Sequence, residues 1–233
     1  MNMYKAIIFD LDNTLLNYTL SELDSMKRTC SDHALFGDDE TQWSSFWETF
    51  LKHNYAHWMD FVNQGSVKSI EDVLRFSFRD TLNADVALHN QLTSTYWNYF
   101  CNTCHFESGA EEVLSVVQSK YRLGIISNGI SEAQKKRLAA GNIQSLFQSV
   151  VVSDEVGIRK PKKEIFDIAL QELRVDYGEV LFVGDSLQDD YHGALNAGID
   201  FCFYNRNQIE LPTSITPKYS IARMQDLLSV GGL

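Results

Sequence analysis

Two acidic residues close the first hydrophobic segment of the chain. Ile7, Ile8 and Phe9 form an apolar run that is typical of a strand buried on both faces of a parallel sheet. Asp10 and Asp12 follow immediately, separated by one residue. Because residues two apart in extended backbone point to the same side, both carboxylates are predicted to crowd one region at the carboxyl end of the strand. Such crowding favours a bound cation or a protonated carboxyl, although Asp and Asn are also common in simple turns.

Groups that suit an anion follow a second predicted strand. The apolar residues 123–126 run into Ser127, Asn128 and Gly129. A hydroxyl and exposed backbone N–H groups at a turn from strand to helix can bind an anion such as phosphate. The same triplet is ordinary turn chemistry, so by itself it does not decide between the two roles.

A lysine follows a third predicted strand. Residues 149–153 have the composition of a strand, and Lys160 comes after them in a short connection. Pro161 disfavours helical backbone at the residue before it and is well suited to begin a helix. We therefore expect Lys160 to be held at the foot of a helix and not along a solvated helical face.

A second acidic cluster follows a fourth predicted strand. Residues 180–183 are apolar and lead through a glycine into Asp185, with Asp189 and Asp190 shortly afterwards. In open α/β sheets, ligands bind outside the carboxyl ends of the strands. The acidic, hydroxyl and ammonium groups are thus all expected where a ligand would bind.

The elements that carry these residues indicate an α/β fold with an insertion. Residues 17–106 contain no strand-like run, and their apolar residues recur at helical spacing, which predicts an inserted α-helical bundle. Alternation of strands and helices resumes afterwards, so residues 1–16 and 107–233 are predicted to form a Rossmann-like parallel-sheet core. Within this core, Ser131 and Gln134 have the spacing of a capping box and are expected to cap the helix after the second strand.

The predicted insertion is rich in aromatic rings. It contains all four tryptophans of the chain. Trp43, Phe46, Trp47 and Phe50 stand three or four residues apart and share one helix face. The simpler interpretation is that these rings form the core of the bundle. The alternative is that one or two of them stack on a substrate.

Composition restricts the classes of partner. The formal net charge is −11 over 233 residues without a cluster of Lys and Arg, so neither a nucleic-acid polymer nor an anionic membrane is an expected partner. A small anionic substrate is compatible with this charge because local cations decide its binding. No segment is long and apolar enough to span a bilayer, and the N-terminus lacks the pattern of a signal peptide. We expect a cytoplasmic protein with its four cysteines reduced.

Taken in order, the four groups of residues resemble the motifs of the haloacid dehalogenase superfamily. The matching segments are Asp10-Leu11-Asp12-Asn13-Thr14, Ser127-Asn128-Gly129, Lys160-Pro161 and Gly184-Asp185-Ser186 through Asp190. The resemblance covers the whole chain, since the helical insertion at 17–106 looks like the mobile cap of that superfamily. The C-terminal half is most similar to the pyrimidine 5′-nucleotidases, on the basis of residues 155–161, residues 193–198 and the loop at 205–217.

This resemblance implies a magnesium-dependent phosphomonoester hydrolase. Asp10 would attack phosphorus to give an aspartyl-phosphate, which divides one difficult step into two. Asp12 would donate a proton to the leaving oxygen and then take one from water. Lys160 would act in catalysis because its charge offsets the repulsion between a carboxylate and a phosphate. The groups assigned to phosphate binding are Ser127, Asn128, Gly129 and Lys160.

The resemblance also implies a set of metal ligands. Mg²⁺ is assigned to Asp10, the backbone carbonyl of Asp12 and Asp185, and such oxygen donors suit a hard cation. Asp190 is assigned to the support of the metal shell or of the catalytic lysine. The neighbouring Asp189 is the alternative for that role.

Competing functions differ in the residues that they require. A sugar-phosphate phosphatase or a phosphomutase keeps the same core residues and differs mainly in the cap. A 2-haloacid dehalogenase shares the fold and the nucleophile but lacks an acid at the position of Asp12. A catalytically silent binding protein is expected to have lost at least one of Asp10, Asp12, Lys160 and Asp185, and all four are present. The expected partner is a small phosphorylated metabolite, first of all a nucleoside 5′-monophosphate, pyrimidine before purine.

Overall fold

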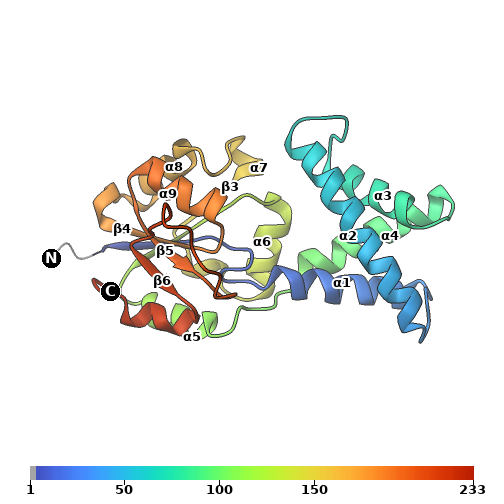
Figure 1. The fold of residues 1–233 in the computed structure, drawn as a ribbon, viewed down its shortest axis with the longest axis horizontal. Coiled ribbons are helices and arrows are strands. Elements are labelled where there is room, and N and C mark those ends of the chain that lie inside the picture. Colours follow the sequence, from blue (N-terminus) through green and yellow to red (C-terminus); the bar gives the residue numbers. More distant parts are fainter. Residues whose placement is uncertain (1–3) are drawn as a thin grey trace. The chain divides into compact units, whose positions relative to one another are not determined.

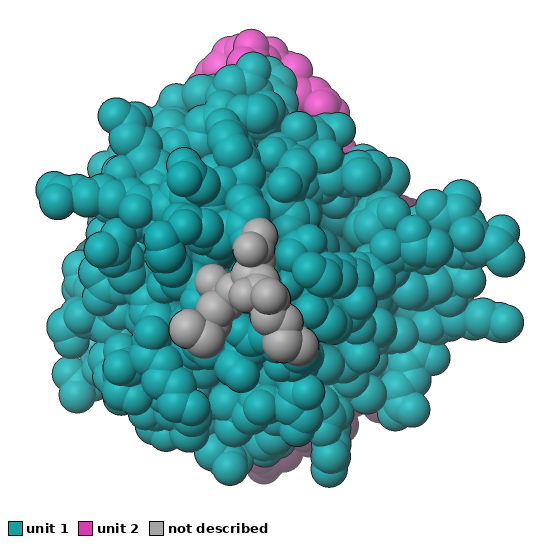
Figure 2. All heavy atoms as spheres, turned by 90° about the vertical axis from the view of Figure 1, so that its left-hand side faces the viewer, with its two compact units in different colours: residues 1–20, 104–233 teal, residues 21–103 magenta. Residues whose placement is uncertain are grey.

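The chain divides into two compact units. The computed structural model describes residues 4–233. A core unit comprises residues 4–20 and 104–233, and a helical unit comprises residues 21–103 (Figure 2). The helical unit therefore lies inside the segment 17–106 that the sequence predicts as an insertion. Its role as a mobile cap stays a prediction.

A parallel sheet forms the centre of the core unit. Within the described residues the sheet has six strands, in the order β3-β2-β1-β4-β5-β6 (Figure 1). Their bounds are β1 (Ala6–Phe9), β2 (Arg122–Ser127), β3 (Ser149–Val152), β4 (Val180–Gly184), β5 (Asp200–Tyr204) and β6 (Tyr219–Ile221). β1 is central and pairs in parallel with both neighbours, so that Ile8 lies opposite Gly124 of β2 and Phe182 of β4. The predicted α/β architecture is confirmed.

Helices cover both faces of this sheet. They are α5 (Ala110–Val117), α6 (Ser131–Ala140), α7 (Ser153–Val156), α8 (Lys163–Leu173) and α9 (His192–Ala197), with short turns η1 (Gln144–Leu146), η2 (Tyr177–Glu179), η3 (Leu187–Tyr191) and η4 (Met224–Ser229). Alternation along β1 determines the two layers, because successive side chains of a strand point to opposite faces. Ile7 and Phe9 pack in the layer that contains residues of α5, α6 and η4, whereas Ile8 packs in the layer with α8 and α9. Each fully buried side chain of this kind contributes about 1.5–3 kcal/mol.

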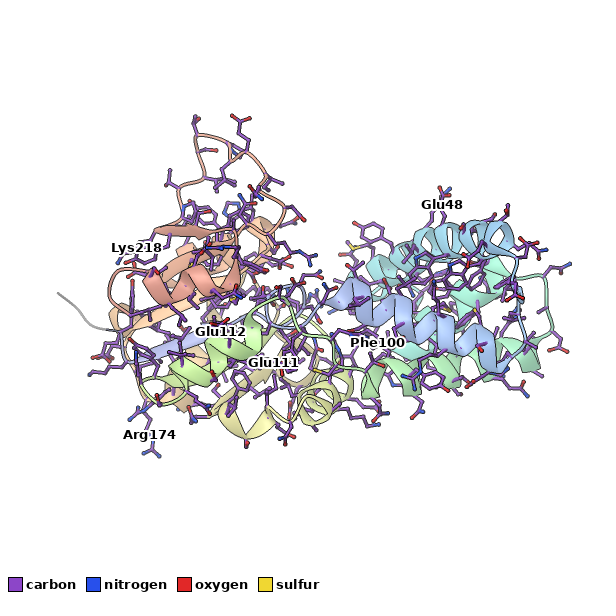
Figure 3. The ribbon with its side chains drawn as sticks, turned by 90° about the horizontal axis from the view of Figure 1, so that it is seen from below. Glu48, Phe100, Glu111, Glu112, Arg174 and Lys218 are labelled. Carbon is purple, nitrogen blue, oxygen red and sulfur yellow. The ribbon has the colours of Figure 1, made fainter. Side chains whose placement is uncertain are left out.

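Local sequence also explains where core helices begin. Glu111 and Glu112 occupy the first turn of α5, where negative charge interacts favourably with the helix dipole (Figure 3). Gly109 precedes the helix with a φ of 83°, a left-handed conformation that glycine adopts readily. Among the described residues, none of the helices combines the length and the apolarity needed to cross a membrane.

The helical unit is built from long amphipathic helices. They are α1 (Tyr18–Asp32), which begins in the core unit, α2 (Glu40–Val62), α3 (Ile70–Thr81) and α4 (Val86–Asn102). A side chain caps each of them: Asn17 accepts a hydrogen bond at the start of α1, Asp39 at the start of α2, Ser69 at the start of α3 and Asp85 at the start of α4. These caps satisfy backbone N–H groups that have no partner within a helix.

Aromatic rings from these helices form the interior of the helical unit. Phe50 is completely buried, and its ring centroid lies 4.9 Å from that of Phe78. Phe46 is also buried, so for these rings of α2 the core interpretation is confirmed. Trp43 and Trp47 are only half-buried and stack on each other with centroids 5.8 Å apart. Trp47 also stacks on Phe50. A contact of these tryptophans with substrate stays a prediction.

The two chain segments that connect the units run side by side within the core unit. The backbone N–H of Asn17 donates to the carbonyl of His105 at 2.7 Å. The N–H of Glu107 donates to the carbonyl of Leu15 at 2.9 Å. These hydrogen bonds hold the two ends of the insertion together within the core unit, a few residues after β1.

Candidate active site

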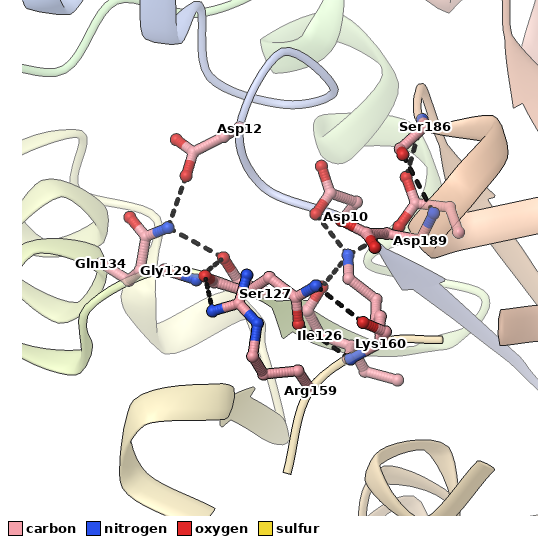
Figure 4. Close-up of polar contacts among 12 residues, drawn as sticks. Asp10, Asp12, Ile126, Ser127, Gly129, Gln134, Arg159, Lys160, Ser186 and Asp189 are labelled. Atoms are coloured by element: carbon pink, nitrogen blue, oxygen red, sulfur yellow. Dashed lines mark hydrogen bonds and ion pairs between the residues drawn. The ribbon is translucent and has the colours of Figure 1, made fainter. Parts of the chain in front are cut away.

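The residues singled out from the sequence gather at one edge of the sheet. Asp10 directly follows β1, Ser127 is the last residue of β2, and Asp185 directly follows β4. β1 lies between the other two strands, so the three side chains start from adjacent positions. Lys160 reaches the same edge from the loop that follows β3 and α7 (Figure 4). The site thus occupies the carboxyl ends of parallel strands, where ligands of α/β proteins bind.

Lys160 is a buried cation of the site. Its side chain is 2% exposed, and Nζ lies 2.6 Å from Oδ1 of Asp10 and 2.7 Å from Oδ1 of Asp190. Nζ also donates to the carbonyl of Ile126 at 2.9 Å. Burial by itself lowers the pKa of Lys160, but the carboxylates of Asp10 and Asp190 outweigh that effect and raise the pKa above its usual value. The lysine is therefore a permanent positive charge beside Asp10.

Three carboxylates form an acidic cluster around this ammonium group. One oxygen from each of Asp10, Asp185 and Asp190 lies within 4.8 Å of the others. Burial raises the pKa of Asp10 well above its usual value, against the opposing effect of Lys160. Burial, followed by the charge of Asp190, raises the pKa of Asp185 to about 7. A single ammonium cannot neutralise three carboxylates, so the cluster favours either a further cation or protonation of one carboxyl.

The donor set of this cluster fits Mg²⁺. Magnesium prefers a small number of carboxylate oxygens and completes its coordination with water and substrate phosphate. Asp10 and Asp185 offer such oxygens in a site that also contains a lysine, as the sequence predicts. The carboxylate of Asp12 is not part of the cluster. The role assigned to Asp12 by resemblance uses its backbone carbonyl and stays a prediction.

The choice between Asp189 and Asp190 follows from the turn η3. The backbone N–H of Asp190 donates to the carbonyl of Ser186 at 3.0 Å, and one oxygen of its side chain accepts from the N–H of Ser186 at 2.9 Å. Asp190 is 1% exposed and reaches Lys160, whereas Asp189 is only partly buried. A Cβ on Gly184 would collide with the Asp190 carboxylate, which explains the glycine at the end of β4. Asp190, and not Asp189, is the acid that contacts Lys160, and its supporting role stays a prediction.

The segment after β2 surrounds the hydroxyl of Ser127. Oγ of Ser127 accepts from the N–H of Gly129 at 3.2 Å and from Nε2 of Gln134 at 2.8 Å. The side chain of Asn128 has a structural role, because its amide bonds both to the backbone N–H of Lys160, at 2.8 Å, and to the carbonyl of the same residue, at 3.1 Å. Asn128 therefore holds the lysine loop in place. The phosphate role predicted for Asn128 is left to its backbone N–H.

Asp12 has two partners that the sequence did not point to. Its Oδ1 lies 2.5 Å from Nη1 of Arg137. Its Oδ2 accepts from Nε2 of Gln134 at 2.6 Å (Figure 4). The predicted capping box is wrong: α6 has no side-chain cap, and Gln134 points into the site instead. Both partners are buried polar residues on α6, three positions apart. The signal in the sequence that could have pointed to Gln134 and Arg137 is the presence of polar residues on the buried face of a helix.

Comparisons with known proteins identify the family. Residues 7–204 match the model of the haloacid dehalogenase-like hydrolases. The chain belongs to this family, which confirms the resemblance of its motifs and the assignment to the hydrolases.

Individual relatives show which members are similar. The pyrimidine 5′-nucleotidase YjjG from Escherichia coli K12 is 30% identical over 224 residues, which cover 95% of each chain. A glyceraldehyde 3-phosphate phosphatase from Pyrococcus abyssi is 32% identical, covering 98% of this chain and 94% of its own. The crystal structure of the hydrolase YfnB from Bacillus subtilis, described as bound to magnesium, has a TM-score of 0.78 at 24% identity and covers 97% of this chain and 98% of its own. This last likeness shows a shared fold.

Proposed function

We propose that this protein is a magnesium-dependent phosphomonoester hydrolase that acts on nucleoside 5′-monophosphates through an aspartyl-phosphate on Asp10. The observation that carries the chemistry is the setting of Asp10, a buried carboxylate that contacts the Lys160 ammonium at 2.6 Å within a cluster of acids. A relative named as a pyrimidine 5′-nucleotidase supports the substrate class, with pyrimidine preferred to purine.

Electrostatics explains why the nucleophile needs this setting. A carboxylate that approaches a phosphate meets a repulsion of about 4 kcal/mol for each pair of unit charges near 4 Å at an effective dielectric constant of 20. Lys160 offsets part of this repulsion from its position beside Asp10. When bound by Asp10, Asp185 and the backbone carbonyl of Asp12, Mg²⁺ would supply the remaining positive charge and polarise a phosphate oxygen.

The residues of the site supply the two steps. A carboxylate oxygen of Asp10 forms a bond to phosphorus while the bond from phosphorus to the ester oxygen breaks. Asp12 gives its proton to that oxygen, so the leaving group departs as an alcohol. Water then attacks the phosphorus of the aspartyl-phosphate, Asp12 takes the proton of that water, and Asp10 is released with inorganic phosphate. Ser127 and the backbone N–H of Asn128 hold the phosphate oxygens.

Substrate preference requires contacts beyond the phosphate. The core residues described above all act on the phosphate group or on the metal, so recognition of a base is assigned to the aromatic helical unit. Stacking of a base on one ring contributes about 1–3 kcal/mol, which corresponds to roughly 5- to 150-fold over a phosphate ester without a base. Trp43 and Trp47 are among the half-buried rings of that unit that could provide it, together with Trp58 and Trp97. With few hydrogen bonds to the base, selectivity among related bases is expected to be loose.

A second candidate function is a sugar-phosphate phosphatase. The relative from Pyrococcus abyssi, named for glyceraldehyde 3-phosphate, is 32% identical, so the same core is compatible with a smaller substrate. A phosphate-release panel separates the two candidates. We expect UMP, dUMP and dTMP to be hydrolysed with a higher kcat/KM than sugar phosphates and amino-acid phosphates. If they are hydrolysed no better than simple sugar phosphates, the nucleotidase assignment fails and the phosphatase chemistry remains.

The chemistry itself has a separate test. We expect activity to be lost in EDTA and restored by Mg²⁺, and Asp10→Asn to abolish it while the protein stays folded. Mass spectrometry of wild-type protein that is acid-quenched during turnover should show a phosphate adduct on the peptide with Asp10. Full turnover in EDTA, or an active Asp10→Asn protein, would end the aspartyl-phosphate mechanism.

A further inference from the structure

Two buried side chains of α6 connect the proton-transfer residue with the phosphate-binding hydroxyl. Gln134 is 2% exposed and Arg137 is 0% exposed. Nη1 of Arg137 lies 2.5 Å from Oδ1 of Asp12 and donates to Oε1 of Gln134 at 3.0 Å. Nε2 of Gln134 donates to Oδ2 of Asp12 at 2.6 Å and to Oγ of Ser127 at 2.8 Å. The amide group of Gln134 therefore contacts each of the other three residues.

The chemistry of the groups determines which way this amide faces. A guanidinium has donors and no acceptor, so the group of Gln134 that meets Arg137 must be the oxygen. The two N–H bonds of the amide then point at Asp12 and Ser127. A Cβ on Gly129 would collide with the Gln134 side chain, so the glycine provides the room that the amide occupies.

This orientation also directs the Ser127 hydroxyl. A hydroxyl has one proton and two lone pairs. Both lone pairs of Ser127 are in use, one by Gln134 and the other by the N–H of Gly129 at 3.2 Å. The hydroxyl proton is therefore the group that Ser127 has left to offer, and a phosphate oxygen is an acceptor for it.

We propose that Gln134, oriented by Arg137, is a positioning residue that sets both the Asp12 carboxyl and the Ser127 hydroxyl for reaction. The proposal rests on the proposed function, in which Asp12 moves protons and Ser127 binds phosphate. Loss of the amide should misplace the acid that protonates the leaving oxygen. It should also let the Ser127 hydroxyl rotate away from the phosphate.

Two esters with different leaving groups separate positioning from a merely structural role. The leaving group of UMP departs as an alcohol and needs a proton. The leaving group of p-nitrophenyl phosphate is a stabilised phenolate and needs little help from an acid. The ratio kcat/KM reports steps up to the aspartyl-phosphate, so it is insensitive to later hydrolysis. Gln134→Glu keeps the length of the side chain and the acceptor for Arg137 but loses both donors. Gln134→Met keeps the volume and serves if the charged variant does not fold.

We expect both variants to lose about 10- to 100-fold in kcat/KM for UMP, part of the 10²–10⁴-fold that a positioned acid supplies. The loss for p-nitrophenyl phosphate should be at least several-fold smaller, and inhibition by inorganic phosphate should weaken in parallel with that smaller loss. Lys136→Met, on the exposed side of the same helix, should leave kcat/KM unchanged for both esters. Arg137→Lys keeps the cation beside Asp12, so its kcat/KM for UMP should lie between the values of wild type and Gln134→Met.

The outcomes are distinct from those of the proposed function. If wild-type protein hydrolyses neither ester, or Asp10→Asn is active, the proposed function itself fails. The inference is overturned if wild type is active and the Gln134 variants lose kcat/KM equally for both esters, or lose it for neither. In both cases Gln134 does not position Asp12.

Discussion

Lys160 and Asp10 are 150 positions apart in the chain, yet Nζ of the lysine and Oδ1 of the aspartate lie 2.6 Å apart in a buried site. The same ammonium lies 2.7 Å from Asp190. One buried cation thus serves the proposed nucleophile and its supporting acid together. It is the group whose removal should disturb both stability and chemistry.

Replacement of the lysine tests this double role. Lys160→Met is expected to lower kcat at least about 100-fold, because the loss of a preorganised charge of this kind costs about 2.7–4 kcal/mol in the transition state. It should also destabilise the protein by up to about 3–5 kcal/mol, because buried carboxylates lose their partner. Thermal unfolding and steady-state kinetics measure the two effects. Lys162→Met, at the exposed position two residues on, is the control and should change neither. An active, fully stable Lys160→Met protein would contradict both roles.

Asp12 is predicted to act in both chemical steps. Asp12→Asn keeps the shape of the side chain but cannot transfer a proton. We expect kcat/KM for UMP to fall by about 10²–10⁴-fold. With p-nitrophenyl phosphate the first step should persist, so rapid-quench experiments should show a burst of nitrophenolate followed by slow turnover. Asp38→Asn, in an exposed loop of the helical unit, is the control. Equal rates with wild type would remove Asp12 from proton transfer.

Asp185 is expected to make the metal-free protein sensitive to pH. Burial and the charge of Asp190 raise its pKa from 3.8 to about 7. A carboxyl with a higher pKa in the folded protein than in the unfolded chain binds more protons when folded. Its contribution to folding stability is therefore complete below pH 4, declines between pH 4 and 7 and is lost above about pH 7.

Asp185→Asn should reveal the loss of folding stability that the ionised Asp185 carboxylate causes above pH 7. In EDTA at pH 8 the variant is expected to unfold at a higher temperature than wild type, because a buried charge has been removed, and the difference should shrink at pH 5. The variant should also lose activity and the stabilisation that Mg²⁺ gives to the wild type. Asp189→Asn, next to the cluster, should behave as wild type in all three measurements. A less stable Asp185→Asn protein at pH 8 would show that the carboxylate is not under electrostatic strain.

Gly184 is a steric test of the Asp190 position. A Cβ there would collide with the Asp190 carboxylate, so Gly184→Ala should push that acid off Lys160 and lower activity by roughly tenfold or more, as misplacement by about 1 Å can cost 10²-fold. Gly178→Ala is the matched control, since no atom lies within 4 Å of its Cβ position. Unchanged activity in Gly184→Ala would mean that the site tolerates a displaced Asp190.

The sequence by itself determined the residues at the strand ends. Asp10, Ser127 and Asp185 each follow an apolar run that is long enough for a buried strand, and parallel strands bring their carboxyl ends to one edge. The helical nature of the insertion was equally local, because periodicity and cap residues such as Ser69 act within a few positions. Signals of this kind do not depend on contacts between distant parts of the chain.

Only the tertiary structure decided the partners of Asp12 and which of the two adjacent acids, Asp189 or Asp190, contacts Lys160. Gln134 and Arg137 lie 122 and 125 positions from Asp12, and nothing in the spacing of a helix tells which buried polar group it will meet. Local rules assigned Gln134 to a helix cap, whereas packing of α6 against the sheet turned it into the site. Likewise, the fold of η3 around Ser186, and not the run of two adjacent acids, selected Asp190 as the partner of Lys160. Hydrogen bonds between side chains depend on atomic positions to within about an ångström. Those positions are defined only once the elements have packed.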